Sequence, residues 1–236
     1  MNLPMECHFP NGVLRQLHSL LYRYLPQDGG EWKAMNNDII ERHADGSARI
    51  RFQPIPAHMT PIAVTETLAH YHRALALNLA DPLVLVPLTV LDFLCIHPFS
   101  DGNGRVARLL TLLLLYQFDY RVGRFISLER IFEESKEGYY ATLELSSQGW
   151  HEGTHDVRPW LDYFWGALLR AYKEFEVRVG TIEKRRGGKG DRIRDEALKR
   201  VLPFSISEIE ESCPGVSRDT VRLVLRSLKA EGLIEP

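Results

Sequence analysis

The sequence has few cysteines and no arrangement of them that would hold a fold together. Cys7, Cys95 and Cys213 are the only three in 236 residues, and no two of them have Cys-x-x-Cys spacing. An odd number of scattered cysteines argues against a disulfide framework and against a cysteine-based zinc site. The composition therefore predicts a protein of the reducing cytoplasm.

Long apolar runs and a strong charge of one sign are also missing. The two longest apolar runs, 83–96 and 109–118, are too short to span a bilayer, and no secretory leader pattern occurs. We therefore expect no membrane partner and no secretion. The net charge is −2, but residues 1–179 carry 17 Lys and Arg against 21 Asp and Glu, whereas residues 180–236 carry 12 against 10. The C-terminal part is thus mildly basic.

A polar and charged stretch, His97–Arg108, joins the two apolar runs. Both runs are apolar on all sides, so each predicts a helix buried in the core. Between them stand a histidine, an aspartate, two glycines flanking an asparagine, and two arginines three residues apart. A charged loop pinned between two buried helices is expensive to build, and this position indicates a functional site.

The second half of this stretch predicts a site for an anion. Gly102 and Gly104 let the backbone approach a ligand closely. A helix that begins near Gly104 would aim its free N–H groups and the positive end of its dipole into the loop. Arg105 and Arg108 are neighbours on one helical face, and their guanidinium forks suit phosphate oxygens.

The first half supplies a metal ligand and a base. Asp101 can hold Mg²⁺, which in proteins usually relies on substrate phosphates to complete its coordination shell. The ordinary pKa of histidine, about 6.5, suits His97 to act as a base near neutral pH. Anion site, metal carboxylate and base together predict phosphoryl or nucleotidyl transfer.

The stretch resembles the signature of Fic domains, His-x-Phe-x-(Asp/Glu)-Gly-Asn-Gly-Arg-x-x-Arg, at every defined position. The resemblance extends over about residues 14–179. It implies a mainly α fold, a Fic-type helical bundle with a small β-hairpin flap that holds the target segment as an added strand. Most Fic enzymes transfer AMP from ATP to a Ser, Thr or Tyr hydroxyl of a protein. The resemblance therefore implies a protein adenylyltransferase that uses Mg²⁺ and ATP on a target protein.

The resemblance also implies a role for each residue of the motif. His97 would take the proton of the attacking hydroxyl, and Asp101 would hold Mg²⁺ across the α- and β-phosphates. The ATP and phosphate contacts would come from Gly102, Asn103, Gly104, Arg105 and Arg108, and the adenine contact from Tyr139 and Tyr140. Two aromatic residues that pack a helix remain the alternative for the tyrosine pair. Relatives that phosphorylate have a bulkier residue at the second glycine position, so Gly104 favours AMP transfer.

Two other functions remain open from the sequence. One is a nucleotide-sensing, DNA-binding regulator without catalysis, although sensing needs no base such as His97. The other is removal of AMP, which the family ties to an inhibitory Ser/Thr-x-x-x-Glu-Gly/Asn helix whose glutamate pairs with the second motif arginine, here Arg108. The only formal match is Ser227-x-x-x-Glu231-Gly232, far from the motif. We therefore expect an open site at Arg108 and a constitutively active chain, or one regulated in trans.

Local signals place the remaining elements of the first 180 residues. Apolar spacing predicts helices over 13–25, 60–78 and 160–179. Asp-Gly between two extended segments predicts a hairpin of 37–43 with 48–52. Asp81-Pro82 opens the helix that leads to the motif, and Pro87 should kink this helix or move its start. Ser127 should cap a single helix that runs to Leu145.

The C-terminal part resembles a winged helix-turn-helix. We expect a domain over 1–180, a basic, glycine-rich linker over 181–191 and a small domain over 192–236. Three helices, over 193–202, after Ser205 in a capping box with Glu208, and after Ser217, would be followed by a strand from 232, leaving the wing incomplete. Arg218, Arg222 and Arg226 form a basic stripe that suits DNA. A small interaction or dimerisation module, and hence a homodimer, is the alternative.

Overall fold

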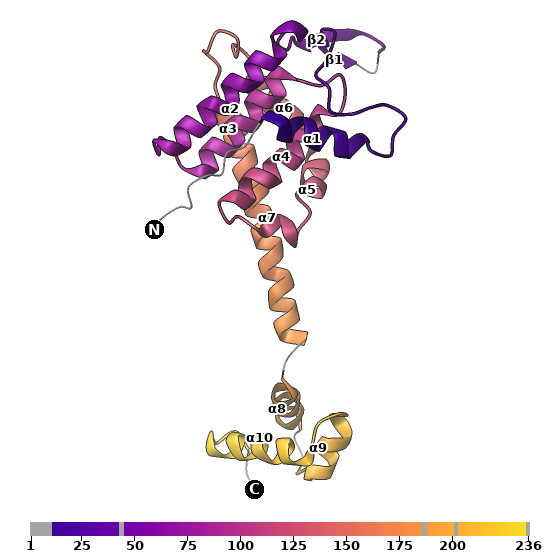
Figure 1. Cartoon of the computed structure of the whole chain (residues 1–236). Coiled ribbons are helices and arrows are strands. Elements are labelled where there is room, and N and C mark those ends of the chain that lie inside the picture. The colour runs from indigo at the N-terminus through magenta and orange to yellow at the C-terminus, as the bar shows by residue number, and fades with distance from the viewer. Residues whose placement is uncertain (1–10, 43–44, 186–187, 201–202, 235–236) are drawn as a thin grey trace. The chain divides into compact units, whose positions relative to one another are not determined.

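The computed structural model describes residues 11–42, 45–185, 188–200 and 203–234. The chain divides into two compact units, Met1–Phe175 and Glu176–Pro236. The first unit is helical with one β-hairpin (Figure 1). Among the described residues, no helix has the length and apolar character needed to cross a membrane.

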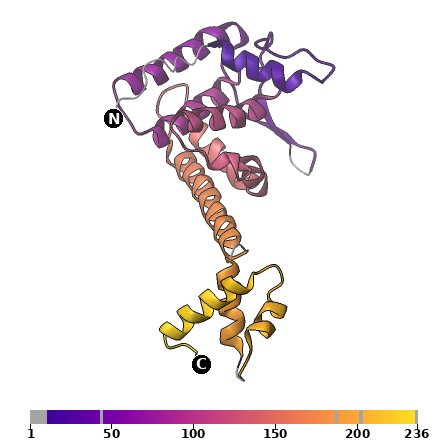
Figure 2. The same cartoon turned by 60° about the horizontal axis from the view of Figure 1, so that its bottom comes forward.

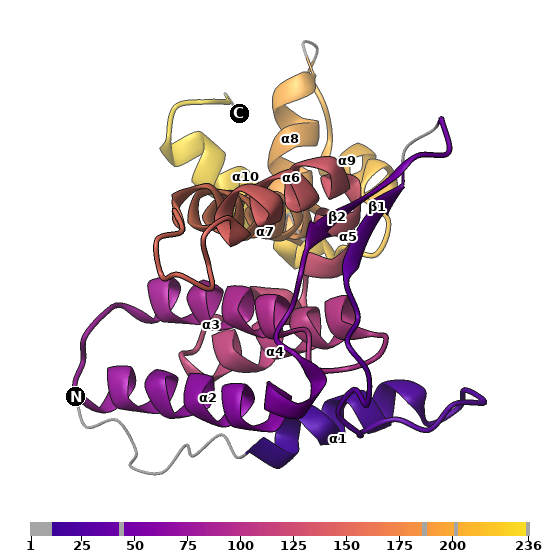
Figure 3. The same cartoon turned by 90° about the horizontal axis from the view of Figure 1, so that it is seen from above.

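The first unit contains two central helices and the elements packed around them. Its elements are α1 (Asn11–Tyr22), β1 (Ile39–Arg42), β2 (Ala48–Phe52), η1 (Ala57–Met59), α2 (Thr60–Ala76), α3 (Pro82–Ile96), α4 (Asn103–Gln117), η2 (Val122–Arg124), α5 (Leu128–Glu134), α6 (Lys136–Ser147) and most of α7 (Arg158–Arg185), whose last residues belong to the second unit. Helix α3 contacts α2, α4 and α6, and α1 contacts α4. Figure 3 shows α2 and α3 running side by side, with the hairpin beside α6.

Helices α3 and α4 form the core, as their apolar sequences predict. Asp81 caps α3 by accepting a hydrogen bond from the backbone N–H of Leu83 at 2.8 Å, and Pro82 occupies the first turn. The buried side chains of α3 include Val86, Val90, Leu91 and Ile96, all at most 2% exposed. The two helices thus deliver the motif to a fixed place in the interior.

Pro87 lies inside α3 and does not move the start of the helix. Proline has no N–H, so the carbonyl of Leu83 lacks its usual helical donor. The indole N–H of Trp165, on α7, donates to that carbonyl at 2.8 Å. The indole N–H of Trp160, one helical turn earlier on α7, donates to the carbonyl of Pro87 at 2.7 Å. Two tryptophans therefore tie α7 to α3.

The predicted hairpin is confirmed. Strands β1 and β2 pair antiparallel, with Ile40 opposite Ile50 and Glu41 opposite Arg49. At the turn Gly46 has φ +83, a conformation that glycine adopts without strain. Arg49 also forms an ion pair with Glu144 on α6, at 2.6 Å, which holds the hairpin against that helix. Residues 43 and 44 of the predicted segments lie outside the described residues.

The single helix predicted after Ser127 is wrong in one respect. Ser127 does cap a helix, but the segment is two helices, α5 and α6, interrupted at Ser135. Ser135 has φ −114 and ψ 28, outside the helical region, and its hydroxyl bonds to the carbonyl of Ile131 at 2.7 Å and to the hydroxyl of Tyr163 at 2.7 Å. Local bonding by serine competes with the helical pattern, and no spacing signal announces it.

The second unit contains three short helices around a small core (Figure 2). They are α8 (Lys189–Lys199), α9 (Ile206–Ser212) and α10 (Arg218–Ala230). The capping box is confirmed, because Ser205 and Glu208 each accept a hydrogen bond from the other's backbone N–H. Ile193, Ile209, Val221 and Leu228 are fully buried.

The strand predicted from residue 232 is wrong. Between residues 203 and 234 the structure has no strand. Gly232 instead has φ +71, and the N–H of Leu233 bonds to the carbonyl of Leu228 at 3.0 Å, so these residues end α10. The described part of the unit therefore contains three helices and no wing.

Two further expectations for this part of the chain are changed. Helix α7 continues to Arg185 and α8 begins at Lys189, so most of the linker predicted over 181–191 is helical. In the basic stripe, Arg218 pairs with Glu210 and Arg222 with Asp219, which reduces its positive charge. Binding of DNA and dimerisation by this unit stay predictions.

The two tryptophans that tie α7 to α3 should differ in their contribution to stability. Trp160→Phe removes a donor that is 1% exposed, and we expect the free energy of unfolding to fall by about 1–3 kcal/mol. Trp165→Phe is the matched control, since the same bond is made by a side chain that is 37% exposed, and it should cost less than about 1 kcal/mol because water replaces the donor. Urea unfolding measures both. Equal losses of unfolding free energy in the two variants would show that burial of the Trp160 hydrogen bond does not determine its contribution to stability.

Candidate active site

The loop between α3 and α4 is held in place by its own residues. His97 ends α3 in the left-handed region, at φ 50, and its N–H bonds to the carbonyl of Phe93 at 3.0 Å. Phe99 is completely buried and anchors the loop in the core. The amide of Asn103 accepts from the N–H of Phe99 at 2.9 Å and donates to its carbonyl at 2.7 Å. These contacts fix the loop before any ligand arrives.

The side chain of Asn103 is engaged within the loop. The residue is 2% exposed, and both ends of its amide bond to the backbone of Phe99. The side chain therefore closes the loop, and what it leaves for a ligand is the backbone N–H group at the start of α4.

The start of α4 has the backbone geometry that the predicted anion site requires. Gly102 precedes the helix at φ 78 and offers no side-chain cap, so the first N–H groups of α4 have no partner within the helix. Gly104 and Arg108 line the same cavity, and a Cβ at Gly104 would lie 3.7 Å from Nη1 of Arg108. A group larger than a methyl at position 104 would occupy the space in front of this arginine.

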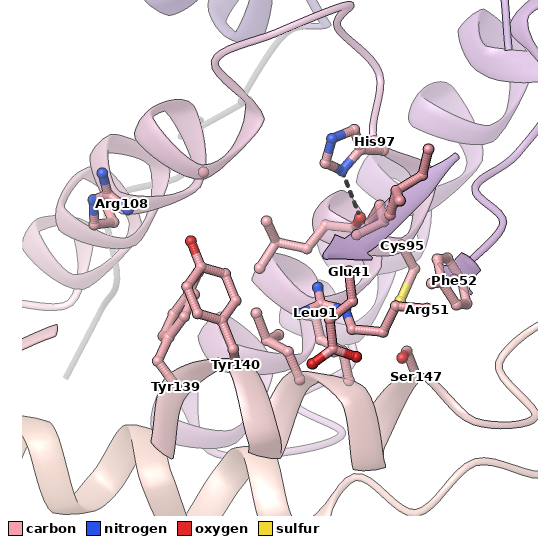
Figure 4. A pocket seen from close by; sticks show the side chains of 15 residues that line it. Glu41, Arg51, Phe52, Leu91, Cys95, His97, Arg108, Tyr139, Tyr140 and Ser147 are labelled. Carbon is pink, nitrogen blue, oxygen red and sulfur yellow. Dashed lines mark hydrogen bonds between the residues drawn. The ribbon is translucent and has the colours of Figure 1, made fainter. Parts of the chain in front are cut away.

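His97 presents one ring nitrogen as a base. Its Nδ1 lies 3.3 Å from the carbonyl oxygen of Leu94, and a carbonyl only accepts, so Nδ1 carries the proton (Figure 4). The lone pair is then on Nε2, and the side chain lines the cavity. This is the tautomer that a general base requires.

The surroundings of His97 keep its ring neutral. Burial, together with the positive charges of Lys33 and Arg51, lowers the pKa of His97 to about 4. Lys33 is 3% exposed, and its Nζ donates to the carbonyl of Ile96 at 3.1 Å, at the end of α3. Burial lowers the pKa of Lys33 itself to about 8, so it remains mostly charged at neutral pH.

Asp101 and Arg105 meet at the hydroxyl of Tyr22, the last residue of α1. Tyr22 donates to Oδ2 of Asp101 at 2.7 Å and accepts from Nη2 of Arg105 at 2.8 Å. Arg105 also contacts the same carboxylate oxygen, at 3.1 Å. The hydrogen bond from Tyr22, the N–H of Gly102 and the charge of Arg105 lower the pKa of Asp101, which is therefore ionised.

A second residue of α1 supports the same loop. His18 stacks on the ring of Phe99, with ring centroids 3.9 Å apart. Its Nδ1 accepts the N–H of Gly30 at 2.7 Å, so its Nε2 carries the proton and donates to the carbonyl of Asp101 at 3.1 Å. Helix α1 thus fixes both the backbone and the carboxylate of Asp101.

Asp101 fits the magnesium role by its chemistry. Mg²⁺ prefers oxygen ligands and is usually bound through one or two carboxylates, substrate phosphates and water. Asp101 is an ionised carboxylate whose side chain is 80% exposed, one residue before the glycine that precedes the anion site. The described residues contain no cluster of three or more metal-binding side chains. Asp101 therefore suits a Mg²⁺ ion whose other ligands are phosphate oxygens and water.

Arg108, which lines the cavity, has a carboxylate partner in the first unit. Glu129, in the first turn of α5, accepts a hydrogen bond from Nε of Arg108 at 3.0 Å and lies 2.9 Å from its Nη2. Glu231 forms an ion pair with Arg194 inside the second unit. The second motif arginine therefore has a carboxylate partner, supplied by an element that the sequence pattern did not indicate.

A cavity of about 480 Å³ opens beside these groups. The hairpin, α3, α4 and α6 supply its walls, and His97, Arg51 and Arg108 lie at its edge (Figure 4). Tyr139 and Tyr140 both line it from α6, the first 7% exposed and the second 43%. The guanidinium of Arg51, on β2, lies 5.4 Å from the ring centre of Tyr140. The structure thus brings the tyrosine pair and the motif to one cavity.

Several residues of the site were not found from the sequence. They are His18, Tyr22, Lys33, Arg51 and Glu129. His18 and Tyr22 follow Leu14 at intervals of four on the buried face of α1, where they look like ordinary core positions, and the other three stand in segments without a motif. Their roles depend on contacts across the fold.

Comparisons with known proteins agree with this geometry. Residues 9–115 match the Fic/DOC family. A Fic-domain signaling protein from Bacteroides thetaiotaomicron superposes with a TM-score of 0.56 at 25% identity, over 69% of this chain and 60% of that one. A Fic family protein from Desulfovibrio desulfuricans superposes with a TM-score of 0.58 at 22% identity, over 94% of this chain and 62% of that one. Fic-1 from C. elegans superposes with a TM-score of 0.52 at 19% identity, over 75% of this chain and 45% of that one.

The proteins from Desulfovibrio desulfuricans and C. elegans are evidence for the fold alone, because each is less than 25% identical to this chain. The match covers less than two thirds of the length of each of these proteins. The family match over residues 9–115, the complete motif and the Fic-like fold lead to one conclusion: this part of the chain is a domain of the Fic/DOC family.

Proposed function

We propose that this domain transfers AMP from ATP to the hydroxyl of a protein side chain. The observation that carries the proposal is the tautomer of His97: its Nε2 has a free lone pair beside a cavity that the start of α4 also lines. A base at this place serves catalysis, whereas a nucleotide sensor would need only the anion site. This favours an enzyme over a regulator that binds nucleotide without reaction.

The proposed reaction is an in-line displacement at the α-phosphate. The target hydroxyl oxygen forms a bond to the α-phosphorus while its proton moves to Nε2 of His97. The bond from the α-phosphorus to the oxygen that bridges to the β-phosphate breaks, and pyrophosphate leaves. The backbone N–H groups at the start of α4 stabilise the charge on the α-phosphate oxygens.

The charged side chains orient the triphosphate. Asp101 would hold Mg²⁺, which would supply positive charge against the phosphates of ATP. Arg105, held beside Asp101, and Arg108, one turn later on α4, would bind the outer phosphates. Gly104 keeps the space in front of Arg108 clear.

Binding of the triphosphate at Arg108 must displace Glu129. The Arg108–Glu129 pair is partly solvated, with 63% of the Glu129 side chain exposed. Ion pairs of this kind are worth about 1 kcal/mol or less. Glu129 should therefore weaken the binding of ATP without preventing it.

The test of the proposal is transfer of label from ATP in the presence of Mg²⁺. Label on the α-phosphate should appear on protein and label on the γ-phosphate should not. Loss of the base, His97→Ala, should reduce transfer by about 10²–10⁴-fold and leave ATP affinity nearly unchanged in calorimetry. The exposed His58→Ala is the matched control. Label from the γ-phosphate, or full transfer by His97→Ala, would refute the proposal.

The lowered pKa of His97 gives a second prediction. An ordinary histidine gains its proton near pH 6.5, but His97, with a pKa of about 4, should stay neutral and able to accept a proton down to about pH 5. NMR titration of the labelled imidazole should show this low midpoint. Lys33→Met removes a positive charge and should raise the midpoint. A midpoint above 6 in the wild-type protein would contradict the electrostatic account.

The role of Glu129 can be measured directly. Glu129→Gln should tighten the binding of Mg²⁺–ATP by up to about fivefold, because Arg108 no longer has a charged partner to give up. Glu231→Gln is the matched control, since it removes the same charge from the ion pair with Arg194. Calorimetry gives both affinities. The proposed competition between Glu129 and phosphate for Arg108 would be contradicted if the control also bound Mg²⁺–ATP more tightly, or if Glu129→Gln did not.

A further inference from the structure

The hydroxyl of Tyr22 is the point at which two groups of the motif are joined. It donates to Oδ2 of Asp101 at 2.7 Å and accepts from Nη2 of Arg105 at 2.8 Å. A phenol has one proton to donate and lone pairs to accept, so one hydroxyl satisfies a carboxylate and a guanidinium in opposite senses. Tyr22 lies 79 residues before Asp101 and outside the motif.

The direct pair between Asp101 and Arg105 is too exposed to fix either group. The two side chains are 80% and 40% exposed, and exposed pairs contribute little because water competes for both charges. Tyr22, by contrast, is 5% exposed. The hydroxyl of this buried residue is therefore the part of the cluster that can set the distance and orientation of the two charged groups.

The ring of Tyr22 is itself fixed against the motif. Its Cε2 and hydroxyl lie 3.0 and 3.1 Å from where a Cβ would stand on Gly102. The guanidinium of Arg105 lies 5.1 Å from the centre of the ring, and the ring of His18 stacks on it with centroids 4.5 Å apart. With these contacts the ring has little freedom to turn, and the hydroxyl keeps its place.

We propose that Tyr22 is a positioning residue that holds Asp101 and Arg105 in the arrangement needed to bind magnesium and nucleotide phosphate together. The inference rests on the magnesium role proposed for Asp101. Tyr22 does not touch the reacting atoms. It acts through the carboxylate and the guanidinium, so its loss should separate two binding events that the wild-type protein couples.

The test is binding of a non-hydrolysable ATP analogue, measured by calorimetry with Mg²⁺ and with chelator. In the wild-type protein Mg²⁺ should tighten binding, and in Tyr22→Phe this tightening should shrink about tenfold, as expected for loss of a hydrogen bond to a charged group. Tyr71→Phe is the matched control, because Tyr71 is 3% exposed and its hydroxyl donates to Gln117, outside the motif. In Tyr71→Phe, Mg²⁺ should tighten binding of the analogue by the same factor as in the wild-type protein.

A double-mutant cycle separates positioning from a general structural effect. If Tyr22 acts through Asp101, the loss caused by Tyr22→Phe should disappear in an Asp101→Asn background, because the carboxylate it positions is already gone. An undiminished loss in that background, or unchanged tightening in Tyr22→Phe alone, overturns the inference.

A further measurement uses the wild-type protein and does not depend on the stability of a variant. Labelled tyrosine rings should show a shift of the Tyr22 signals in NMR spectra when Mg²⁺ and the analogue are added, and no shift for Tyr71. An unshifted Tyr22 overturns the inference. None of these binding measurements requires transfer of AMP, so failure of the proposed reaction would leave them readable.

Discussion

The site depends on one short clasp, the pair of hydrogen bonds between the amide of Asn103 and the backbone of Phe99. The clasp closes a loop that must leave α3 through a left-handed histidine and enter α4 through a left-handed glycine. Phe99 lies in the core, so the loop cannot move without opening the interior. The base, the anion site and the metal carboxylate are therefore placed by the packing of two buried helices.

Charge at the site follows from this placement. The cations Lys33, Arg51, Arg105 and Arg108 outnumber the carboxylates Glu41, Asp101 and Glu129, which suits a polyanionic substrate. Burial, together with the charges of Lys33 and Arg51, lowers the pKa of His97 and keeps its lone pair available. A strongly anionic substrate would offset some of that charge, so the basicity of His97 should rise as the site fills.

Local signals in the sequence predicted the elements that local chemistry determines. The caps at Asp81 and Ser205, the hairpin and the motif loop all follow from residues a few positions apart. The tail strand was wrong because the residues after Gly232 complete the end of α10. The break at Ser135 was missed because a side-chain hydroxyl, and not a glycine or proline, causes it.

Outside the motif and the tyrosine pair, the residues of the site could not be predicted. Tyr22 meets its partners across 79 and 83 residues, and Glu129 meets Arg108 across 21. No spacing rule reaches over such separations, because they depend on how the helices pack. The partner of Arg108 was missed because the sequence was searched only for a known inhibitory pattern. Any carboxylate that the fold brings near an exposed guanidinium can pair with it.

The two motif arginines are consequently held in different ways, and this difference affects how each would bind phosphate. Arg105 is fixed from α1 by a buried tyrosine beside the metal carboxylate, so little order is lost when phosphate arrives there. Arg108 is held from α5 by an exposed glutamate, which the ligand must replace. Arg105 would thus meet phosphate as part of a preorganised site, whereas Arg108 must exchange one anionic partner for another. Because the Arg108–Glu129 pair is largely solvated, this exchange costs about 1 kcal/mol or less, so under the proposed function Glu129 lowers the affinity for the outer phosphates without closing the site to them.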